Sequence, residues 1–226
     1  MNQISKPRVL LADDHGILLA GVRKLIEDRC DIVGTAVDGR ALLEAASRLQ
    51  PDLIILDISM PLLNGLDAAR QLRKLLPETK LLFLTMHASP RYATEALKVG
   101  ASGFLLKQTA DEELPQAITA VLQGKQYLTP SITKPVIAQF LNPEETRVIK
   151  GDPSALTARQ REVLQLIGEG KGTKEIATVL KVSCKTVQFH KTCLRQELDI
   201  HSTGELMRYA ITHGLASKEP DSSSSP

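Results

Sequence analysis

The chain has 226 residues, of which 42% are hydrophobic and 24% charged, and its formal net charge is +2. At about 150 residues per domain, this length indicates one large domain or two small ones, and the apolar content suffices for a buried core, which excludes wholesale disorder. No apolar run approaches the roughly 18 to 20 residues of a membrane span, and Asp13 and Asp14 stand where a signal peptide would have its apolar core. We expect a cytoplasmic protein that does not act at a membrane.

Cysteine and aromatic usage excludes two further classes. The three cysteines, Cys30, Cys184 and Cys193, are odd in number and far apart, so they form neither a disulfide framework nor a zinc site by themselves. This usage fits a reducing compartment. Aromatic residues make up 3% of the chain and Trp is absent, which argues against a platform that stacks single-stranded nucleic acid on aromatic rings.

Charge and chain-breaking residues divide the sequence into parts. Residues 1–128 hold 15 basic and 15 acidic residues, whereas residues 154–213 hold 9 basic and 6 acidic ones, a local net charge of +3. Four prolines and a glycine lie between the two parts, at Pro130, Pro135, Pro143, Gly151 and Pro153. We predict a first domain over 1–128, a linker over 129–153 with one short helix at 133–141, a second domain over 154–214 and a disordered tail over 215–226.

The first 128 residues alternate apolar and amphipathic segments. Short apolar runs without period-2 alternation predict strands that are buried on both faces, as in a parallel sheet. They span residues 9–12, 32–36, 53–56, 81–84 and 104–106, and the helices are predicted at 16–27, 40–49, 66–75, 91–99 and 111–122. Five strands alternating with five helices predict an open, doubly wound α/β domain, because parallel neighbours require right-handed crossovers.

Polar residues stand at the C-terminal ends of four of these strands, where ligands bind in an open α/β sheet. They are Asp13 and Asp14, Asp57, Thr85 and Lys107. Three clustered carboxylates repel one another unless a hard dication such as Mg²⁺ lies between them. Asp57 is then placed to attack a phosphoryl donor and form an aspartyl phosphate, with Lys107 neutralising the transferred oxygens and Thr85 donating a hydrogen bond to them.

Each of these residues also has a plain structural interpretation. The Asp13–Asp14 pair is often a solvated turn that caps the following helix, and an Asp shortly before Pro61 often opens a turn. Lys107 alone would usually be a surface lysine whose stem covers apolar neighbours. Their joint occurrence on four strand ends of one sheet favours a functional site.

The second domain shows helical periodicity with recognisable helix starts. We predict four helices, with capping boxes at Thr157–Gln160 and Ser202–Glu205 and caps at Thr173 and Ser183. The second and third helices are joined by the tight turn Lys181–Val182, which is the geometry of a helix-turn-helix. The exposed face of the third helix is predicted to carry Lys185, Gln188, Lys191, Thr192 and Arg195, a mixture of phosphate-contacting cations and groups that bind base edges. From pattern alone, a helical bundle with a solvated basic face remains equally compatible.

Four segments of the first domain resemble the receiver domain of bacterial response regulators, over about residues 7–128. They are LLADDH at 10–15, LDISMP at 56–61, LTMH at 84–87 and GASGFLLK at 100–107. The resemblance implies a flavodoxin-like receiver in which Asp57 is the phosphoacceptor, while Asp13, Asp14, Asp57 and the carbonyl of Ser59 bind Mg²⁺. It also implies that Thr85 and Phe104 are switch residues beside Lys107, and that Gly65 forms the turn after the acceptor loop.

The second domain is similar to the DNA-binding domain of the LuxR type, which identifies the chain as a member of the NarL/FixJ class. The resemblance is carried by LTAR at 156–159, EVL at 162–164, KEIA at 174–177 and SCKTVQFH at 183–190. It implies that DNA contacts are made by Lys185, Thr186, Gln188, Phe189, Lys191 and Thr192, with the two lysines on phosphates. Phe189 could contact a thymine methyl or pack against its own domain. This chain departs from the family in having Gln160 for Glu, Glu197 for a basic residue and Cys193 for Asn, and the first two changes together could mean that an ion pair was replaced.

The predicted function is a two-component transcription regulator, not an enzyme. Its expected partners are a sensor histidine kinase, double-stranded DNA and a second copy of the chain on DNA. Two alternatives stay open at this point. One is a phosphorelay or partner-binding protein that uses its C-terminal helices only for association. The other is a phosphatase of the haloacid dehalogenase type, which is disfavoured because such enzymes have Asp-x-Asp after the first strand and this chain has adjacent Asp13 and Asp14.

Overall fold

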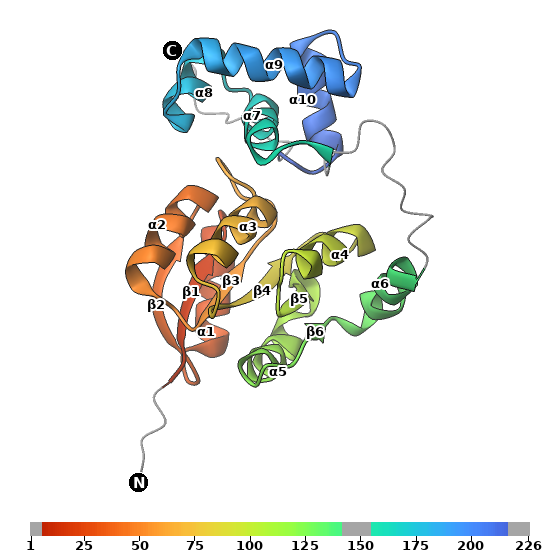
Figure 1. Ribbon diagram of the computed structural model, residues 1–226. Helices are drawn as coiled ribbons and strands as arrows, with labels where there is room; N and C mark the ends of the chain where they lie inside the picture. The colour runs from red at the N-terminus through yellow and green to blue at the C-terminus, as the bar shows by residue number, and fades with distance from the viewer. Residues whose placement is uncertain (1–5, 142–154, 217–226) are drawn as a thin grey trace. The chain divides into compact units, whose positions relative to one another are not determined.

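The computed structural model describes residues 6–141 and 155–216 and shows two compact units. The first is an α/β unit built on one sheet, and the second is all-helical (Figure 1). None of the helices in the described ranges combines the length and apolarity that a membrane span requires.

The α/β unit contains one parallel sheet of six strands in the order β2-β1-β3-β4-β5-β6. The strands are β1 (Arg8–Ala12), β2 (Asp31–Ala36), β3 (Leu53–Leu56), β4 (Lys80–Thr85), β5 (Gly103–Leu106) and β6 (Tyr127–Leu128). The five predicted strands are confirmed, and all four residues of β3 and of β5 are buried, as a sheet covered on both faces requires. The sequence prediction missed β6, because two residues are too few to show a strand pattern.

Helices cover both faces of this sheet (Figure 1). They are α1 (Gly16–Ile26), α2 (Gly39–Leu49), α3 (Gly65–Leu75), α4 (Pro90–Lys98) and α5 (Ala110–Leu122), while α6 (Pro130–Leu141) packs on α4. Residues of α1 and α5 share one core with β1, β3, β4 and β5, while α2 packs against α3. Arg70 of α3 forms an ion pair of 3.3 Å with Glu95 of α4, so that α3 and α4 are also neighbours.

The helix expected inside the linker belongs to the α/β unit. It begins at Pro130, three residues earlier than predicted, and its Ile132 and Val136 are buried. Thr94 Oγ1 on α4 donates to Gln139 Oε1 on α6 at 2.8 Å. The polypeptide from 129 to 141 is therefore packed structure, and the rest of the predicted linker, like the tail from 217 onward, lies outside the described residues.

The all-helical unit contains α7 (Ala158–Gly168), α8 (Thr173–Leu180), α9 (Cys184–Leu198) and α10 (Thr203–Thr212). The predicted capping boxes at Thr157 and Ser202 and the cap at Ser183 are confirmed. The cap of α8 was predicted one residue too late, because Gly172 holds this position and its N–H donates to the carboxylate of Glu175 at 2.7 Å. The hydroxyl of Thr173 is instead bound by Lys191 Nζ at 3.0 Å.

The predicted turn of this unit is also present, and the helices share one core. Lys181, between α8 and α9, adopts a left-handed backbone with φ of 53°, which ends α8. The four helices bury one apolar cluster, which contains Val163, Leu164, Ile167, Ile176, Ala177, Leu180, Val187, Leu194, Leu206 and Ala210. Each of the four helices thus turns its apolar face into one shared core.

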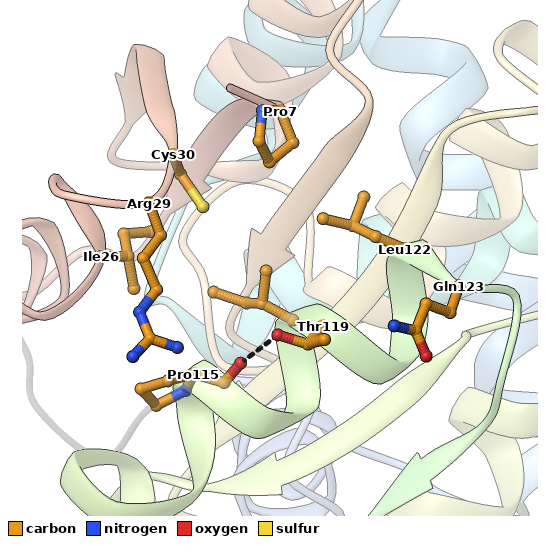
Figure 2. A pocket seen from close by; sticks show the side chains of 9 residues that line it. Pro7, Ile26, Arg29, Cys30, Pro115, Thr119, Leu122 and Gln123 are labelled. Atoms are coloured by element: carbon orange, nitrogen blue, oxygen red, sulfur yellow. Dashed lines mark hydrogen bonds between the residues drawn. The ribbon is translucent and has the colours of Figure 1, made fainter. Parts of the chain in front are cut away.

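A cavity of about 270 Å³ opens between the end of α1 and the face of α5 (Figure 2). It is lined by Pro7, Ile26, Arg29, Cys30, Pro115, Ile118, Thr119, Leu122 and Gln123. Burial raises the pKa of the Cys30 thiol, which keeps it protonated and a poor nucleophile. Because Pro7 and Cys30 directly precede β1 and β2, the cavity lies at the N-terminal ends of the strands, away from the edge where ligands bind in such sheets.

The close approach of α7 and α10 provides a test of the packing in the helical unit. A Cβ built on Gly168 would lie 2.6 Å from Ala216 Cβ and 2.7 Å from Ala210 Cβ, and neither methyl can rotate away. We expect Gly168→Ala to lower the free energy of unfolding of this unit by about 1–3 kcal/mol, the usual cost of overpacking. Urea-dependent hydrogen exchange of the amides in α7 and α10 measures this unit separately.

Gly204→Ala is the matched control, because a Cβ there meets nothing within 4 Å. It should leave the unfolding free energy unchanged or raise it slightly, since alanine favours the helix. Equal unfolding midpoints for the two variants would show that α7 and α10 are not packed as closely as described.

Candidate functional site

Three of the polar residues predicted at the C-terminal edge of the sheet are in direct contact. Asp13 follows β1, Asp57 follows β3 and Lys107 follows β5. Lys107 Nζ lies 2.7 Å from Asp13 Oδ2 and 2.7 Å from Asp57 Oδ2, and all three side chains are at most 6% exposed. One ammonium is thus shared between two buried carboxylates from different strands.

The loop after β3 fixes the Asp57 carboxylate. Its backbone N–H continues the sheet by donating to the Ala12 carbonyl at 2.9 Å, and its Oδ1 accepts from the Ile58 N–H at 2.6 Å. The turn closes where the Gly65 N–H donates to the Ile58 carbonyl at 2.8 Å. A Cβ on Gly65 would lie 1.9 Å from the Asp57 carbonyl oxygen, so only glycine fits this position.

Asp14 carries negative charge that the protein only partly compensates. Its Oδ1 is buried and has no hydrogen-bond partner among the described residues, although His15 Nδ1 lies 2.9 Å away without hydrogen-bond geometry. Burial raises the pKa of Asp14, His15 opposes this effect, and the charges of Asp13 and Asp57 raise the pKa further. An additional cation beside Asp14 would therefore be stabilised.

The cluster that could hold such a cation includes His15, which was not among the predicted ligands. Asp13, Asp14 and His15 offer ligand atoms that lie within 4.8 Å of one another. Carboxylate oxygens and a buried oxygen without a partner fit Mg²⁺, which prefers oxygen ligands and keeps several waters. His15 fits this ion less well, since a ring nitrogen is a softer donor; its position directly after the acidic pair was the signal for its proximity.

His87 is a second residue near the site that was not selected. Its Nε2 lies 2.7 Å from Ser59 Oγ, so that the loop after β4 is hydrogen-bonded to the loop after β3. Its backbone N–H donates to Thr85 Oγ1 at 3.3 Å, and its ring lies 4.5 Å from that of Tyr92. Burial lowers the pKa of His87, the charge of Asp57 opposes this, and Lys107 lowers the pKa further. The only sequence signal was its place two residues after Thr85.

The two residues with predicted switch roles are both enclosed. Thr85 and Phe104 are 0% exposed, and the Phe104 ring centroid lies 6.4 Å from that of Phe83 on the neighbouring strand. Thr85 stands at the end of β4 and Phe104 in β5, on adjacent strands that end at the site. Their switching roles stay a prediction.

In the helical unit, α9 presents most of the predicted DNA-contacting residues to solvent. Lys185, Gln188, Phe189 and Thr192 are exposed, and Thr186 is half-buried with its hydroxyl 2.8 Å from Ser183 Oγ. Phe189 is 64% exposed. Among the aromatic rings of the described residues it pairs with His190 alone, edge-on, with ring centroids 5.6 Å apart. Of the two alternatives for this side chain, packing into its own domain is contradicted.

Lys191 does not lie on that exposed face, which corrects the prediction. It is 8% exposed, its Nζ donates to Thr173 Oγ1, and burial lowers its pKa. The reason is helical spacing: position 191 lies four residues after Val187 and three before Leu194, and both of these face the core. Helical spacing therefore predicts the burial of Lys191 better than its positive charge predicts exposure.

Two departures from the family pattern form a direct contact. Gln160 Nε2 on α7 donates to Glu197 Oε1 on α9 at 2.8 Å, and Gln160 Oε1 accepts from the Thr157 N–H at 2.8 Å. A single amide thus caps α7 and joins it to the C-terminal half of α9. The two positions are therefore joined by an amide–carboxylate hydrogen bond in this chain. Nothing in the structure explains Cys193.

Comparison with protein families identifies both units. Residues 9–119 match the response regulator receiver domain, and residues 154–210 match the luxR family of bacterial regulatory proteins. The oxygen regulatory protein NreC of Staphylococcus carnosus (strain TM300) is 37% identical over 213 residues, which cover 92% of this chain and 98% of that protein. The transcriptional regulatory protein MctR of Rhizobium johnstonii is 35% identical over 221 residues, which cover 96% and 99%.

Solved structures agree with these relatives. The RcsB response regulator of Salmonella typhimurium is similar with a TM-score of 0.63 and 27% identity, over 93% of this chain and 99% of that one. An RcsB–DNA complex is similar with a TM-score of 0.56 and 28% identity, over 92% and 99%. Since both units and nearly the whole length match, the chain belongs to the NarL/FixJ class of DNA-binding response regulators, in which a receiver domain is joined to a LuxR-type DNA-binding domain.

Proposed function

We propose that this regulator accepts a phosphoryl group on Asp57 from a sensor histidine kinase and thereby changes how it binds DNA. The observation that carries the proposal is the pair of 2.7 Å contacts that hold Lys107 between Asp57 and Asp13. They place a fixed positive charge beside a buried carboxylate, where the negative charge of a transferring phosphoryl group would develop. A nucleophilic carboxylate beside a fixed cation is the arrangement that phosphoryl transfer requires.

The electrostatics keep Lys107 charged. Burial alone would lower its pKa, but the charge of Asp57 and the hydrogen bonds to Asp13 and Asp57 outweigh burial and raise the pKa above its ordinary value. Lys107 therefore remains an ammonium at neutral pH and acts by its charge. It needs to supply no proton to the reaction.

We further propose that Asp13, Asp14, Asp57 and the carbonyl of Ser59 hold Mg²⁺. The buried Asp14 Oδ1 without a hydrogen-bond partner supports this assignment. When bound, the ion supplies positive charge to the phosphoryl oxygens. The chain's own groups then act as follows: an Asp57 carboxylate oxygen attacks phosphorus, the new O–P bond forms, and the bond from phosphorus to the donor nitrogen breaks. The leaving imidazole keeps the electron pair of that bond.

The consequence for DNA follows from the helical unit. We propose that α9 enters the major groove, with Lys185 on a phosphate and Gln188, Phe189 and Thr192 toward base edges, while Thr186 lies at the start of this surface. RcsB has been solved as dimers bound to DNA, which supports a homodimer on DNA for this chain as well. The protein would then act as a regulator in the cytoplasm, where bacterial DNA lies, and would not turn over a small-molecule substrate.

The central prediction is labelling of one aspartate. With acetyl phosphate and Mg²⁺, the wild-type chain should gain one phosphoryl group, because Asp57 is the carboxylate beside both Lys107 and Asp13. Asp57→Asn should gain none, and the exposed Asp111→Asn should be labelled like wild type. Intact-mass spectrometry followed by peptide mapping measures the outcome.

Removal of the metal gives an independent arm of this experiment. Labelling should be lost when EDTA is added and should return with excess Mg²⁺. Labelling at another residue, or undiminished labelling of Asp57→Asn, would contradict the assignment of the phosphoacceptor. Labelling that persists in EDTA would contradict the proposed role of Mg²⁺ alone.

The acceptor loop offers a second prediction. Gly65→Ala places a methyl group against the Asp57 carbonyl, so the loop must move and the carboxylate with it. We expect the labelling rate to fall at least about tenfold, which corresponds to about 1.4 kcal/mol in the barrier. Gly16→Ala is the control, because it also lies beside the site but a Cβ there meets nothing within 4 Å. The expectation fails if both variants are labelled at the same rate.

DNA binding can be tested before the operator sequence is known. Affinity for a short duplex of mixed sequence should fall steeply with salt, because bound phosphates release counterions. Lys185→Ala should reduce the slope of log K against log salt by about 1. Lys125→Ala removes the same charge from the receiver and should leave the slope unchanged. A salt-independent affinity, or equal slopes for both variants, would contradict the proposed face.

A further inference from the structure

The cavity between the end of α1 and the face of α5, here called the α1–α5 cavity, lies apart from the phosphorylation site. Its volume of about 270 Å³ is just below the range of about 300–1,000 Å³ for pockets that hold drug-sized ligands. One water molecule takes up about 30 Å³ of the liquid, so the cavity has room for a molecule of roughly nine or ten non-hydrogen atoms. Its size therefore suits a small ligand.

The inner wall of the α1–α5 cavity is apolar and belongs to the core of the receiver. Ile26 at the end of α1, Cys30 before β2 and Ile118 in α5 are all buried members of one core cluster. Leu122 packs against the same cluster. Because burial raises its pKa, the Cys30 thiol stays protonated and acts as a small apolar group. An aliphatic chain in the cavity would thus extend this core and be stabilised by its own burial.

The other groups of the lining also suit an aliphatic chain. Thr119 Oγ1 donates to the Pro115 carbonyl at 2.9 Å within α5, so this hydroxyl already has a partner (Figure 2). Pro7 and Pro115 have no N–H to offer to a ligand. The nine lining residues, all within the described part of the chain, include no Phe, Tyr, Trp or His on which a flat ligand could stack. The lining therefore favours an aliphatic ligand over an aromatic one.

Arg29 gives one side of the cavity a positive charge. Of the nine described residues in the lining, Arg29 alone is charged. Among the described residues its guanidinium has no hydrogen bond or ion pair, and the nearby Glu27 carboxylate is bound by Lys24 at 2.5 Å. Figure 2 shows the guanidinium beside Pro115, on the side of the cavity opposite to Gln123. Because a guanidinium can donate two parallel hydrogen bonds to a carboxylate, the cavity joins an apolar interior to an anion-binding end.

We propose that the α1–α5 cavity binds a medium-chain aliphatic carboxylate, for which octanoate is a model of matching size. The aliphatic tail lies against Ile26, Cys30 and Ile118, and the carboxylate binds the guanidinium of Arg29. This site is at the N-terminal ends of the strands and does not involve Asp57. It therefore goes beyond the proposed function and does not depend on it. A ligand that binds only the folded receiver also stabilises it as the ligand concentration rises.

Titration calorimetry of the full chain with straight-chain carboxylates tests the apolar part of the site. Octanoate should bind at one molecule per chain with a Kd of about 1 mM or tighter. From butanoate to octanoate the affinity should rise about fourfold for each methylene group, because each one is buried. Dodecanoate should bind no tighter than octanoate, since its additional methylene groups find no room in the cavity. An affinity that rises steadily to dodecanoate would indicate adsorption to the surface and would overturn the proposal.

A comparison of octanoate with octanol tests the charged part of the site. Arg29→Gln should weaken octanoate binding about fivefold, as expected for a partly exposed charge-assisted contact, and should leave octanol binding unchanged. Arg23→Gln is the matched control, because it removes the same charge from an exposed position of α1 that does not line the cavity. Octanoate affinities that are equal for these two variants would overturn the assignment of the carboxylate to Arg29.

A variant that fills the cavity provides a third arm. Cys30→Met places a longer apolar side chain in this space, so octanoate and octanol should both bind at least about tenfold more weakly. Cys184→Met is the control, because it makes the same exchange at an exposed position of the helical unit. Thermal unfolding shows whether Cys30→Met is folded; if it is not, the chain-length series and the Arg29 comparison decide. A folded Cys30→Met protein that binds octanoate like wild type would overturn the proposal.

A second copy of the chain is the competing occupant of the cavity, and sedimentation velocity distinguishes it from a small ligand. The proposal expects Cys30→Met and wild type to sediment alike, because no chain–chain contact depends on the cavity. A wild-type dimer that Cys30→Met dissociates, together with the lack of saturable octanoate binding, would assign the cavity to a contact between copies and overturn the ligand site.

Discussion

The receiver depends on one shared cation. Lys107 lies 2.7 Å from a carboxylate oxygen of Asp13 and at the same distance from one of Asp57. Without this ammonium, two buried negative charges would face each other, and like charges about 4 Å apart cost about 4 kcal/mol at an effective dielectric of 20. The compensation is incomplete, since Asp14 adds a third carboxylate with a raised pKa. The site is therefore stable as folded and still attracts a further cation, which is the property that phosphoryl transfer requires.

The position of this cation follows from the parallel sheet. Because all strands run in one direction, the residues after β1, β3 and β5 meet at one edge, and the helices that follow start from the same edge. A change in charge there reaches α4 and β5 at their points of attachment. α6 contacts both of these elements, through Thr94 and Thr129. The architecture that gathers the reacting groups thus also positions α6.

In the helical unit, short helices share one small core and are also joined by polar contacts. Gln160 serves both as the N-terminal cap of α7 and as a hydrogen-bond donor to Glu197 of α9. This bond directly joins the two positions at which the chain departs from the family pattern. The bond holds the C-terminal half of α9 against α7, and Glu197 gives this part of α9 a negative charge.

The sequence by itself determined the five main strands, the ten longer helices in outline and the convergence of Asp13, Asp57 and Lys107, because hydrophobic period and strand direction are local properties. Only the tertiary structure decided which side chains bond to each other. Lys191 is drawn inward by its place between Val187 and Leu194, Thr173 receives Lys191 in place of capping α8, and His87 bonds to Ser59. It also decided that α6 belongs to the receiver and that β6 joins the sheet. The helical spacing alone indicates the inward position of Lys191. Its partner Thr173 is 18 residues away and the partner of His87 is 28 residues away, and no local pattern records such pairs.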